Sequence, residues 1–353
     1  MMEPERALRA GVVGTGGISK EHLAFLAASP RAELVGVCDV SPAAGAHAAE
    51  TYGTTAYASV AAMLEGASPD VVHVLTPPTT HIAIAEQCLA AGAHVVCEKP
   101  ITLDAPSLEG LLATAERAGR RIVENHNYRF NPEVVHIDGL VAAGTLGRVA
   151  EVEIRMGLPV NDPGGRFGDP NLPSPIHLLP AGVIHDFITH LVYLLDHFAT
   201  DADWHTVDSR WSNHGGLAHV AVDDLDSMLV GDTPDGAVHG RIRFSAQLAP
   251  DCFEVTVRGT RGYGQVEIFA GRVQKVVPRP VGEQLSSIAN LMIGGIDLFA
   301  SGPRSFKRKI MQEGPYVGLA RFLDLTYAAL ASGAEPPVTG ADMLRTSRLI
   351  DRL

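Results

Sequence analysis

The chain has 353 residues, which is longer than a single hydrophobic core usually extends and therefore favours two domains. Its formal net charge of -12 argues against a nucleic-acid-binding protein, which would carry a basic balance or a basic stripe. The four cysteines form no CxxC pair, so they fit a reducing compartment rather than a disulfide scaffold.

Hydropathy along the chain predicts a cytoplasmic protein that does not bind a membrane. The N-terminal residues lack the long apolar core of a signal peptide. We find no apolar run close to the roughly 20 residues that a bilayer-spanning helix needs. The one dense basic cluster, 304-RSFKRK-309, is interpreted as a solvated helix end.

The first part of the chain alternates short apolar runs with longer alanine-rich segments. Runs that are almost wholly apolar and alternate with helices predict a parallel sheet covered on both faces. We therefore predict a Rossmann-type doubly wound domain over residues 1–127. The expected strands are 8–13, 33–38, 71–76, 94–98 and 121–125, and the clearest helices are 81–93 and 104–119.

The pattern changes after about residue 130. Helical periodicity covers 133–143, a glycine- and proline-rich loop covers 157–182, and a further helix covers 183–198. Residues 204–277 form successive strands without intervening helices, which favours a predominantly antiparallel or mixed sheet in an α+β domain. We assign residues 128–339 to this second domain, with a helix at 316–332, and expect the last helix, 340–353, to pack back on the first.

The segment 12-VVGTGGIS-19 follows the first expected strand and predicts a dinucleotide site. Gly14, Gly16 and Ser19 occupy the positions of a G-x-G-x-x-G/A motif, which permits a tight turn, close approach of a pyrophosphate and close helix packing. Asp39 ends the second strand, where a carboxylate binds ribose hydroxyls and repels a 2′-phosphate, so NAD is favoured over NADP. Alternatively, Asp39 caps the helix after Pro42.

A second motif, 75-LTPPTTHIAIAEQCLAAGAHVVCEKPITLD-104, runs from one strand end to the next. Ligands bind at the carboxyl ends of the strands in an open parallel sheet. The motif therefore places Thr76, Glu98 and Lys99 beside the expected nicotinamide. The cofactor-binding candidates are Gly14, Thr15, Gly16, Gly17, Ile18, Asp39, Thr76, Pro77, His81, Glu98 and Asn127.

These motifs resemble the Gfo/Idh/MocA oxidoreductases, named for glucose–fructose oxidoreductase and inositol dehydrogenase. The likeness rests on TPP-x-x-H, A-G-x-H-V-x-x-EKP, 126-HNYRFNP-132 and the C-terminal pattern 335-EPPVTGADMLRTSRLID-351. The resemblance implies that Lys99 contacts substrate and cofactor. It also implies that the second domain is built on an open-faced sheet, and that homodimers or homotetramers form through the exposed face of this sheet.

Asp186 and His190 lie four residues apart and share one face of the helix at 183–198. A histidine titrates near neutral pH and suits the proton transfer that accompanies alcohol oxidation, and a nearby carboxylate can orient it. The alternative is a surface pair on a helix. The family resemblance implies His190 as acid/base with Asp186 beside it. His185 and Ile188 depart from the family pattern, and we expect no metal, since no HxxxH or HExxH motif occurs.

Substrate-side candidates follow the expected strand at 121–125, lie in the long loop at 157–182, or lie on the helix at 183–198. Arg129 could equally form a structural salt bridge where the two expected domains join. Arg166 could bind a diphosphate. The substrate candidates are Tyr128, Arg129, Arg166, His177 and His185.

The sequence predicts an NAD-dependent dehydrogenase acting on a secondary hydroxyl of a sugar, cyclitol or sugar derivative. Lys99 would polarise the reacting oxygen and His190 would take the proton. Two alternatives remain open: a redox-neutral enzyme that uses tightly held NAD for transient oxidation, and a dinucleotide-sensing regulator without turnover. Neither a substrate nor a direction of reaction follows from the residues.

Overall fold

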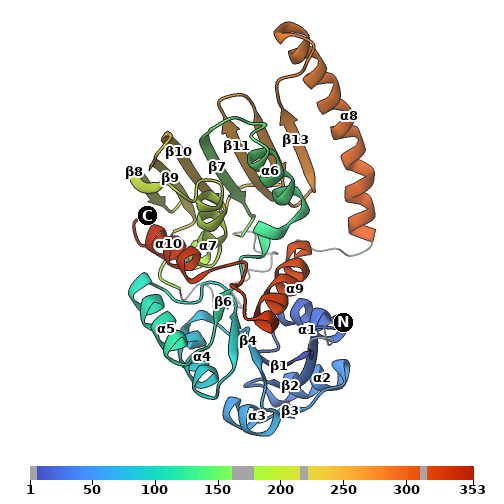
Figure 1. The fold of residues 1–353 in the computed structure, drawn as a ribbon, viewed down its shortest axis with the longest axis vertical. Helices are drawn as coiled ribbons and strands as arrows, with labels where there is room; N and C mark the ends of the chain where they lie inside the picture. Colours follow the sequence, from blue (N-terminus) through green and yellow to red (C-terminus); the bar gives the residue numbers. More distant parts are fainter. Residues whose placement is uncertain (1–5, 161–178, 215–221, 311–315) are drawn as a thin grey trace. The chain divides into compact units, whose positions relative to one another are not determined.

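The computed structural model describes residues 6–160, 179–214, 222–310 and 316–353 (Figure 1). Contacts within the chain divide it into two compact units. The first comprises Met1–Asn127 and Gly318–Asp351, and the second comprises Tyr128–Val317 and Arg352–Leu353. Each unit is built on one sheet.

The sheet of the first unit has six parallel strands in the order β3-β2-β1-β4-β5-β6. This is the doubly wound order of a Rossmann fold, which confirms the predicted fold class. Its central strands are apolar because helices cover both faces: Val12, Val72 and Val95 are 0% exposed. The strands are β1 (Leu8–Val13), β2 (Ala32–Cys38), β3 (Ala56–Tyr57), β4 (Val71–Val74), β5 (His94–Cys97) and β6 (Ile122–Glu124).

The helices of this unit fall into two groups, since α1 contacts α2 whereas α3, α4 and α5 contact one another in succession. Right-handed crossovers place the two groups on opposite faces, because the strand order reverses between β1 and β4. That reversal is the switch point at which open α/β sheets bind ligands. The helices are α1 (Ser19–Ala28), α2 (Pro42–Tyr52), α3 (Val60–Ala67), α4 (His81–Ala90) and α5 (Ala105–Arg117), with a 3-10 turn at Pro78–Thr80.

Two C-terminal helices, α9 (Val317–Ser332) and α10 (Gly340–Ile350), complete the first unit. The predicted second domain extends to residue 339 and so includes α9. In the structure, α9 belongs to the first unit instead. Its Tyr327 is fully buried against Phe25 of α1, with the ring centroids 5.8 Å apart. α10 contacts α5 and β6, and its N-terminus is closed by a capping box between Thr339 and Asp342.

The second unit contains a seven-stranded sheet in the order β13-β12-β11-β7-β10-β9-β8. All its pairings are antiparallel except that of β7 with β10, so the sheet is mixed and mostly antiparallel, as predicted. The strands are β7 (Val149–Gly157), β8 (Asp203–Ser212), β9 (Asp224–Thr233), β10 (Gly236–Ser245), β11 (Cys252–Gly259), β12 (Tyr263–Glu267) and β13 (Arg272–Val276).

The central strand β7 was absent from the predicted elements. The alternation in 151-EVEIRM-156 carries its signal, because Val152, Ile154 and Met156 are all 0% exposed while the residues between them point to the other face. On the buried face, α7 (Gly182–His197) packs against β7 and β10, and α6 (Pro132–Ala142) packs against β12 (Figure 1).

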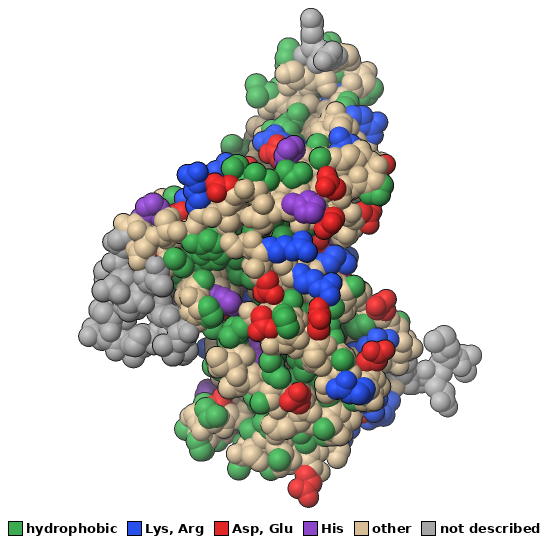
Figure 2. Space-filling model, turned by 90° about the vertical axis from the view of Figure 1, so that its left-hand side faces the viewer, with side chains coloured by type: hydrophobic (Ala, Val, Ile, Leu, Met, Phe, Trp, Pro, Cys, Tyr) green, Lys and Arg blue, Asp and Glu red, His purple; other side chains and the backbone are tan. Residues whose placement is uncertain are grey.

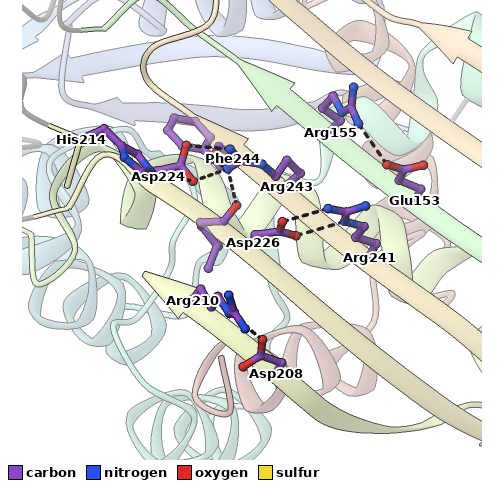
Figure 3. A network of polar contacts seen from close by, with 11 residues as sticks. Glu153, Arg155, Asp208, Arg210, His214, Asp224, Asp226, Arg241, Arg243 and Phe244 are labelled. Atoms are coloured by element: carbon purple, nitrogen blue, oxygen red, sulfur yellow. Dashed lines mark hydrogen bonds and ion pairs between the residues drawn. The ribbon is translucent and has the colours of Figure 1, made fainter. Parts of the chain in front are cut away.

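The opposite face of this sheet carries ion pairs within and between strands (Figure 3). Arg241 of β10 donates to Asp226 of β9 from two nitrogens, at 3.1 and 2.9 Å, and Arg243 donates to Asp224 in the same way. The hydrogen bond from Arg241 is the main reason that the pKa of Asp226 is lowered. Much of this face is therefore polar and paired within one chain.

A long helix, α8 (Glu283–Ile310), follows β13 and contacts it (Figure 1). Its segment Leu285–Pro303 has a mean hydropathy of 1.3, is only 11% buried, and is long and apolar enough to cross a membrane by length and composition. This corrects the expectation from the sequence that no such run occurs.

On the face shown in Figure 2, acidic and basic side chains are interspersed with apolar ones rather than gathered into a basic stripe.

Candidate functional site

The glycine loop between β1 and α1 has the geometry that the motif predicts. Gly14 has a positive φ of 93°, and a Cβ at this position would lie 2.8 Å from the backbone oxygen of Leu75, so only glycine fits where β1 and β4 end side by side. At Gly16, in contrast, no described atom lies within 4 Å of an added Cβ. Gly16 is exposed, and the backbone there is open to a ligand.

The N-terminus of α1 adds to this opening. Its N-cap residue, Ile18, makes no side-chain capping hydrogen bond, so the first amides of the helix are not occupied by a cap. Ser19 is buried and donates to the Gly16 carbonyl at 2.6 Å, which holds the loop against the helix. The Ser19 and Glu21 amides donate to the Gly16 and Ile18 carbonyls, at 3.1 Å each. The positive end of the helix dipole and the open backbone at Gly16 suit a diphosphate, so the loop fits the pyrophosphate of a dinucleotide.

Asp39 lies at the carboxyl end of β2 and is tied to the same loop. One carboxylate oxygen accepts from the backbone amide of Thr15 at 2.7 Å and from its hydroxyl at 2.8 Å. The other oxygen accepts from Ser41 at 2.8 Å. Burial raises the pKa of Asp39, but these hydrogen bonds outweigh it and the net pKa is lowered, so the group is ionised at neutral pH.

The helix cap that the alternative reading assigned to Asp39 is supplied by Ser41, whose hydroxyl accepts from the Ala44 amide. A carboxylate offers about four acceptor positions, and three are used here. Asp39 therefore retains capacity for a ribose hydroxyl while it holds the glycine loop in place.

The loop that carries Lys99 is anchored by buried side chains on both sides. Before Lys99, Glu98 accepts from Asn125 at 2.6 Å and pairs with His22 Nε2 at 3.1 Å. After it, the Ile101 amide donates to Glu124 at 2.7 Å. Lys99 itself is half-buried at the carboxyl end of β5, and its bond to Pro100 is a cis peptide.

His81 joins this loop to the end of β4. Its Nδ1 lies 3.0 Å from the Pro100 carbonyl, and its Nε2 lies 2.7 Å from the Thr76 carbonyl. Burial lowers the pKa of His81, although the two carbonyl contacts oppose that shift. Because both ring nitrogens face backbone oxygens, His81 is placed to connect two loops rather than to face a ligand. Thr76 is held as well, since its hydroxyl accepts from Thr80 at 2.7 Å.

Behind Glu98 runs a fully buried chain of polar side chains. His22 of α1 lies 2.8 Å from His73 of β4, nitrogen to nitrogen, and His73 Nε2 lies 2.9 Å from the Tyr327 hydroxyl of α9. All three side chains are 0% exposed. One set of neutral tautomers satisfies every contact: Tyr327 donates to His73, His73 to His22, and His22 to Glu98.

The pKa shifts of the groups in this chain of side chains agree with these tautomers. Burial, followed by the neighbouring His22, lowers the pKa of His73 well below its usual value, so His73 stays neutral. Burial raises the pKa of Glu98, but His22, Lys99 and Asn125 together outweigh it and the net pKa is lowered. Burial also raises the pKa of Tyr327, so its hydroxyl keeps its proton and can donate. The chain therefore keeps Glu98 ionised beside Lys99.

Asn127 follows β6, in the 3-10 turn Asn127–Phe130, and is 1% exposed. Its side-chain nitrogen is buried and makes no hydrogen bond in the described structure. A buried amide donor without an acceptor is costly, and a bound ligand could satisfy it. Asn127 therefore fits its predicted place among the cofactor contacts.

In the second unit, α7 carries the predicted acid/base pair. His190 is 5% exposed and packs edge-on against Tyr128, with the ring centroids 4.7 Å apart. Asp186 and His185 are half-buried on the same helix. The burial of this helix reflects its apolar residues, such as Ile188 and Leu191, which cover the sheet.

The hydrogen-bond partner of His190 is a residue that the sequence analysis missed. Nδ1 of His190 lies 2.9 Å from the hydroxyl of Tyr193, one turn further along α7. The same oxygen accepts from the Tyr128 amide at 3.1 Å. A tyrosine three residues after a histidine on a helix is the signal that could have predicted this contact.

The predicted residues are divided between the two units. The first unit carries the glycine loop, Asp39, Thr76, His81, Glu98, Lys99 and Asn127, and the second carries Tyr128, Arg129, His185, Asp186 and His190. Arg166 and His177 lie outside the described residues. Sequence reasoning missed His22, His73, Glu124, Asn125, Tyr193 and Tyr327, which act through contacts with the predicted residues.

Comparison with known proteins agrees with this geometry. Residues 8–126 match the model of an oxidoreductase family with an NAD-binding Rossmann fold, GFO_IDH_MocA. The first unit of this chain therefore matches the NAD-binding domain of the Gfo/Idh/MocA oxidoreductases. The family match covers the glycine loop, Asp39 and the loop of Lys99, so the first unit is an NAD(P)-binding domain.

Curated members of the family resemble this chain over less than their full length. It is 34% identical over 158 residues to dTDP-3,4-didehydro-2,6-dideoxy-alpha-D-glucose 3-reductase of Streptomyces violaceoruber, a match that covers 44% of this chain and 46% of that protein. It is 31% identical to inositol 2-dehydrogenase of Rhizobium meliloti (strain 1021), over 46% of this chain and 51% of that protein. The chain spans about half the length of the curated relatives it matches.

The fold likeness extends over the whole chain. The WlbA dehydrogenase of Bordetella pertussis, solved in complex with NADH and UDP-GlcNAcA, superposes with a TM-score of 0.76 and 21% sequence identity. That superposition covers 99% of this chain and 94% of the other. At this identity the likeness establishes the fold of both units and leaves the chemistry to the residues themselves.

Proposed function

We propose that this chain is an NAD-dependent oxidoreductase that acts on a secondary hydroxyl or ketone of a sugar, a cyclitol or a sugar derivative, nucleotide sugars included. The observation that carries the proposal is the anchored loop around Lys99. Buried carboxylates hold the backbone on both sides of Lys99, at the carboxyl end of a strand in an NAD(P)-binding domain. The relatives named above act on sugars and inositols, which supports the substrate class.

In this proposal Lys99 donates a hydrogen bond to the reacting oxygen. A cation beside that oxygen stabilises the negative charge that develops as the hydroxyl loses its proton. Glu98 is held ionised next to Lys99 by His22 and Asn125, and it favours the charged form of the lysine. When bound, the nicotinamide accepts or returns the hydride.

His190 takes the hydroxyl proton in the oxidation and returns it in the reverse direction. The Tyr193 hydroxyl can accept from Nδ1 when that nitrogen is protonated and donate to it when it is not, so the contact persists through both states. Asp186 is half-buried on the same helix, one turn before His190, and this spacing supports a role beside the imidazole.

Asp39 selects NAD in this proposal. Its ionised carboxylate remains able to accept from a ribose hydroxyl and repels the 2′-phosphate of NADP. The open backbone at Gly16 and the uncapped start of α1 support a diphosphate beside it.

The decisive experiment measures NADH formation at 340 nm with purified protein, NAD and a panel of sugars, inositols, glycosides and nucleotide sugars. Lys99→Met should reduce turnover by about 10²- to 10³-fold, the usual effect of removing a donor that stabilises developing negative charge. The dissociation constant of NAD should change little. Lys275→Met, in β13 of the second unit, is the matched control and should keep full turnover.

Unchanged turnover in Lys99→Met would remove Lys99 from the mechanism. If the protein binds NAD but forms no NADH with any compound of the panel, mass spectrometry of the purified protein separates the two alternatives. Retained cofactor together with a changed substrate would indicate redox-neutral chemistry. Reversible cofactor binding alone would indicate a dinucleotide sensor.

A further inference from the structure

The long helix α8 is attached to the second unit by its polar side. Ser286 and Asn290 are buried, and the Ser286 hydroxyl accepts from the Arg279 amide at 2.9 Å. Asn290 accepts from Arg279 Nε at 2.8 Å and donates to the Val277 carbonyl at 2.9 Å. The usual arrangement of a surface helix, with its apolar side against the core, is therefore reversed.

The apolar side of α8 faces outward. Its large apolar residues expose most of their surface: Leu285 59%, Ile288 57%, Leu291 81%, Met292 66%, Ile296 67%, Leu298 56%, Phe299 84% and Phe306 67%. At about 100 to 200 Å² each they expose on the order of 1,000 Å². Monomeric proteins rarely expose more than a few hundred Å² in one patch, whereas a standard interface buries about 800 Å² on each partner.

The exposed residues follow a seven-residue repeat. Leu285, Met292, Phe299 and Phe306 are spaced by seven and form one row of large side chains. A second row begins at Ile288, three residues after Leu285, and continues with Gly295 and Gly302, again spaced by seven. All seven residues are exposed, while Ser286, Asn290, Ile293 and Asp297, which occupy other heptad positions, are buried or half-buried. Two such rows are the a and d positions of a helix–helix seam.

The two rows are complementary to each other when two helices pair antiparallel. In that arrangement the residues at position a of one helix face the residues at position d of its partner. With a two-fold axis beside residue 297, Phe299 faces Gly295 of the second copy, and Met292 faces its Gly302. Phe306 then faces its Ile288. A large side chain thus meets a glycine in two of the three layers on each side of the axis. At Gly295 and Gly302 no described atom lies within 4 Å of an added Cβ, so both positions are open to receive a side chain.

We propose that α8 is a dimerisation helix that pairs antiparallel with α8 of a second copy of this chain. The interface is isologous, as two-fold symmetry requires, because the same two rows contribute on both sides. It is separate from the charged face of the seven-stranded sheet, whose arginines and aspartates are paired within one chain.

A membrane surface is the competing occupant, since the same helix is apolar enough to insert. The glycine row favours the second copy. Glycines at every seventh position remove apolar area that a membrane-binding helix would use, whereas they create the holes that a facing helix needs. The four basic residues of α8, Arg304, Lys307, Arg308 and Lys309, all lie in its last seven residues, whereas the polar residues that attach the rest of the helix, Ser286 and Asn290, are uncharged. Membrane-surface helices favour basic residues along their whole polar side.

Sedimentation velocity of the full chain tests the proposal with three variants. Phe299→Glu places a charge in the seam and should raise the dissociation constant at least 100-fold, so that the mass of the assembly falls by half. Gly295→Leu fills a hole while it adds apolar area, and it should weaken association as well. Leu325→Glu, at an exposed apolar residue of α9 in the first unit, is the control and should leave the mass unchanged.

NAD binding and circular dichroism of each variant verify that the units remain folded. The proposal is overturned if the wild-type chain is a monomer at 100 µM, or if Phe299→Glu keeps the wild-type mass. It is also overturned if Gly295→Leu associates as strongly as the wild type, since a contact without holes would gain from the added leucine. Flotation of the wild type, but not of Phe299→Glu, with vesicles of phosphatidylcholine and phosphatidylglycerol would assign the helix to a membrane instead.

Discussion

At the scale of single residues, neighbouring side chains support both His190 and the charge beside Lys99. Tyr193 holds the imidazole of His190, and Glu98 holds the charge beside Lys99. Each contact is made inside one unit, so each cluster is organised before any ligand binds. Such preorganisation reduces the cost of orienting the groups during the reaction.

Replacing Tyr193 with phenylalanine removes only the hydroxyl that contacts Nδ1 of His190. A single hydrogen bond contributes about 1 kcal/mol, so we expect kcat to fall by about 5- to 10-fold. The dependence of kcat on pH should shift as well, because the partner that accompanies both protonation states of His190 is lost. His197→Asn, which removes a ring bound to Asp138 near the other end of α7, is the control and should change neither.

An unaltered pH profile in Tyr193→Phe, with kcat reduced, would assign Tyr193 to packing alone. An unaltered kcat would remove the contact from the mechanism. Steady-state kinetics between pH 5.5 and 9 distinguish these results.

At the scale of elements, the turn between β1 and α1 depends on β2. Asp39, the first residue after β2, binds the amide and the hydroxyl of Thr15 within the glycine loop. The carboxylate that is proposed to select NAD therefore also fixes the shape of the loop. These two roles can be separated, because only one of them involves the Thr15 hydroxyl.

Asp39→Ser shortens the side chain and removes its charge. We expect kcat/KM with NAD to fall by about tenfold, or about 1.4 kcal/mol, and the ratio of NADP to NAD activity to rise. Thr15→Val removes the hydroxyl contact but keeps the carboxylate, so it should leave that ratio unchanged. A ratio that changes equally in both variants would mean that Asp39 acts through the loop, and a ratio that changes in neither would remove Asp39 from cofactor selection.

At the scale of the whole molecule, the first unit is completed by helices from the far end of the chain. Tyr327 of α9 reaches His73 of β4 across 254 residues of sequence, and the polar chain continues through His22 to Glu98. Because His73 is fully buried and its pKa is lowered, its protonation is linked to the folding of the unit.

We predict that the first unit loses stability as the pH falls below about 6.5. An unfolded His73 binds a proton below that value, whereas the folded His73, whose pKa is lowered, does not. The unfolded state thus binds more protons, and the free energy of unfolding decreases as the pH falls. His73 alone should account for about 2 kcal/mol between pH 7 and 5, and the lowered pKa of His81 adds to the effect.

Native-state hydrogen exchange of the β1 and β4 amides, corrected for intrinsic rates, measures this dependence. His73→Asn should be less stable at pH 7 but should lose less between pH 7 and 5 than the wild type. An equal loss in both proteins would show that His73 is not the group that titrates.

Much of the first unit could be predicted from the sequence because its signals are local. The apolar strands, the glycine turn and the Glu98–Lys99 strand end are each contained in a short segment, and the structure places them where the periodicity and the turn chemistry indicate. The strand β7 was also readable from its alternation and was overlooked. The seven-residue repeat of α8 was likewise readable and overlooked, but only the structure shows that its polar side, and not its apolar side, is buried.

Only the tertiary structure decided which residues support the site and how the chain's ends are used. His22, His73 and Tyr327 carry no local signal, since a buried histidine or tyrosine looks the same in sequence whether it fills a core or completes a hydrogen-bonded chain. The assignment of α9 to the first unit likewise depends on contacts between residues far apart in sequence. Periodicity reports which face of an element is buried, but packing alone determines what that face meets.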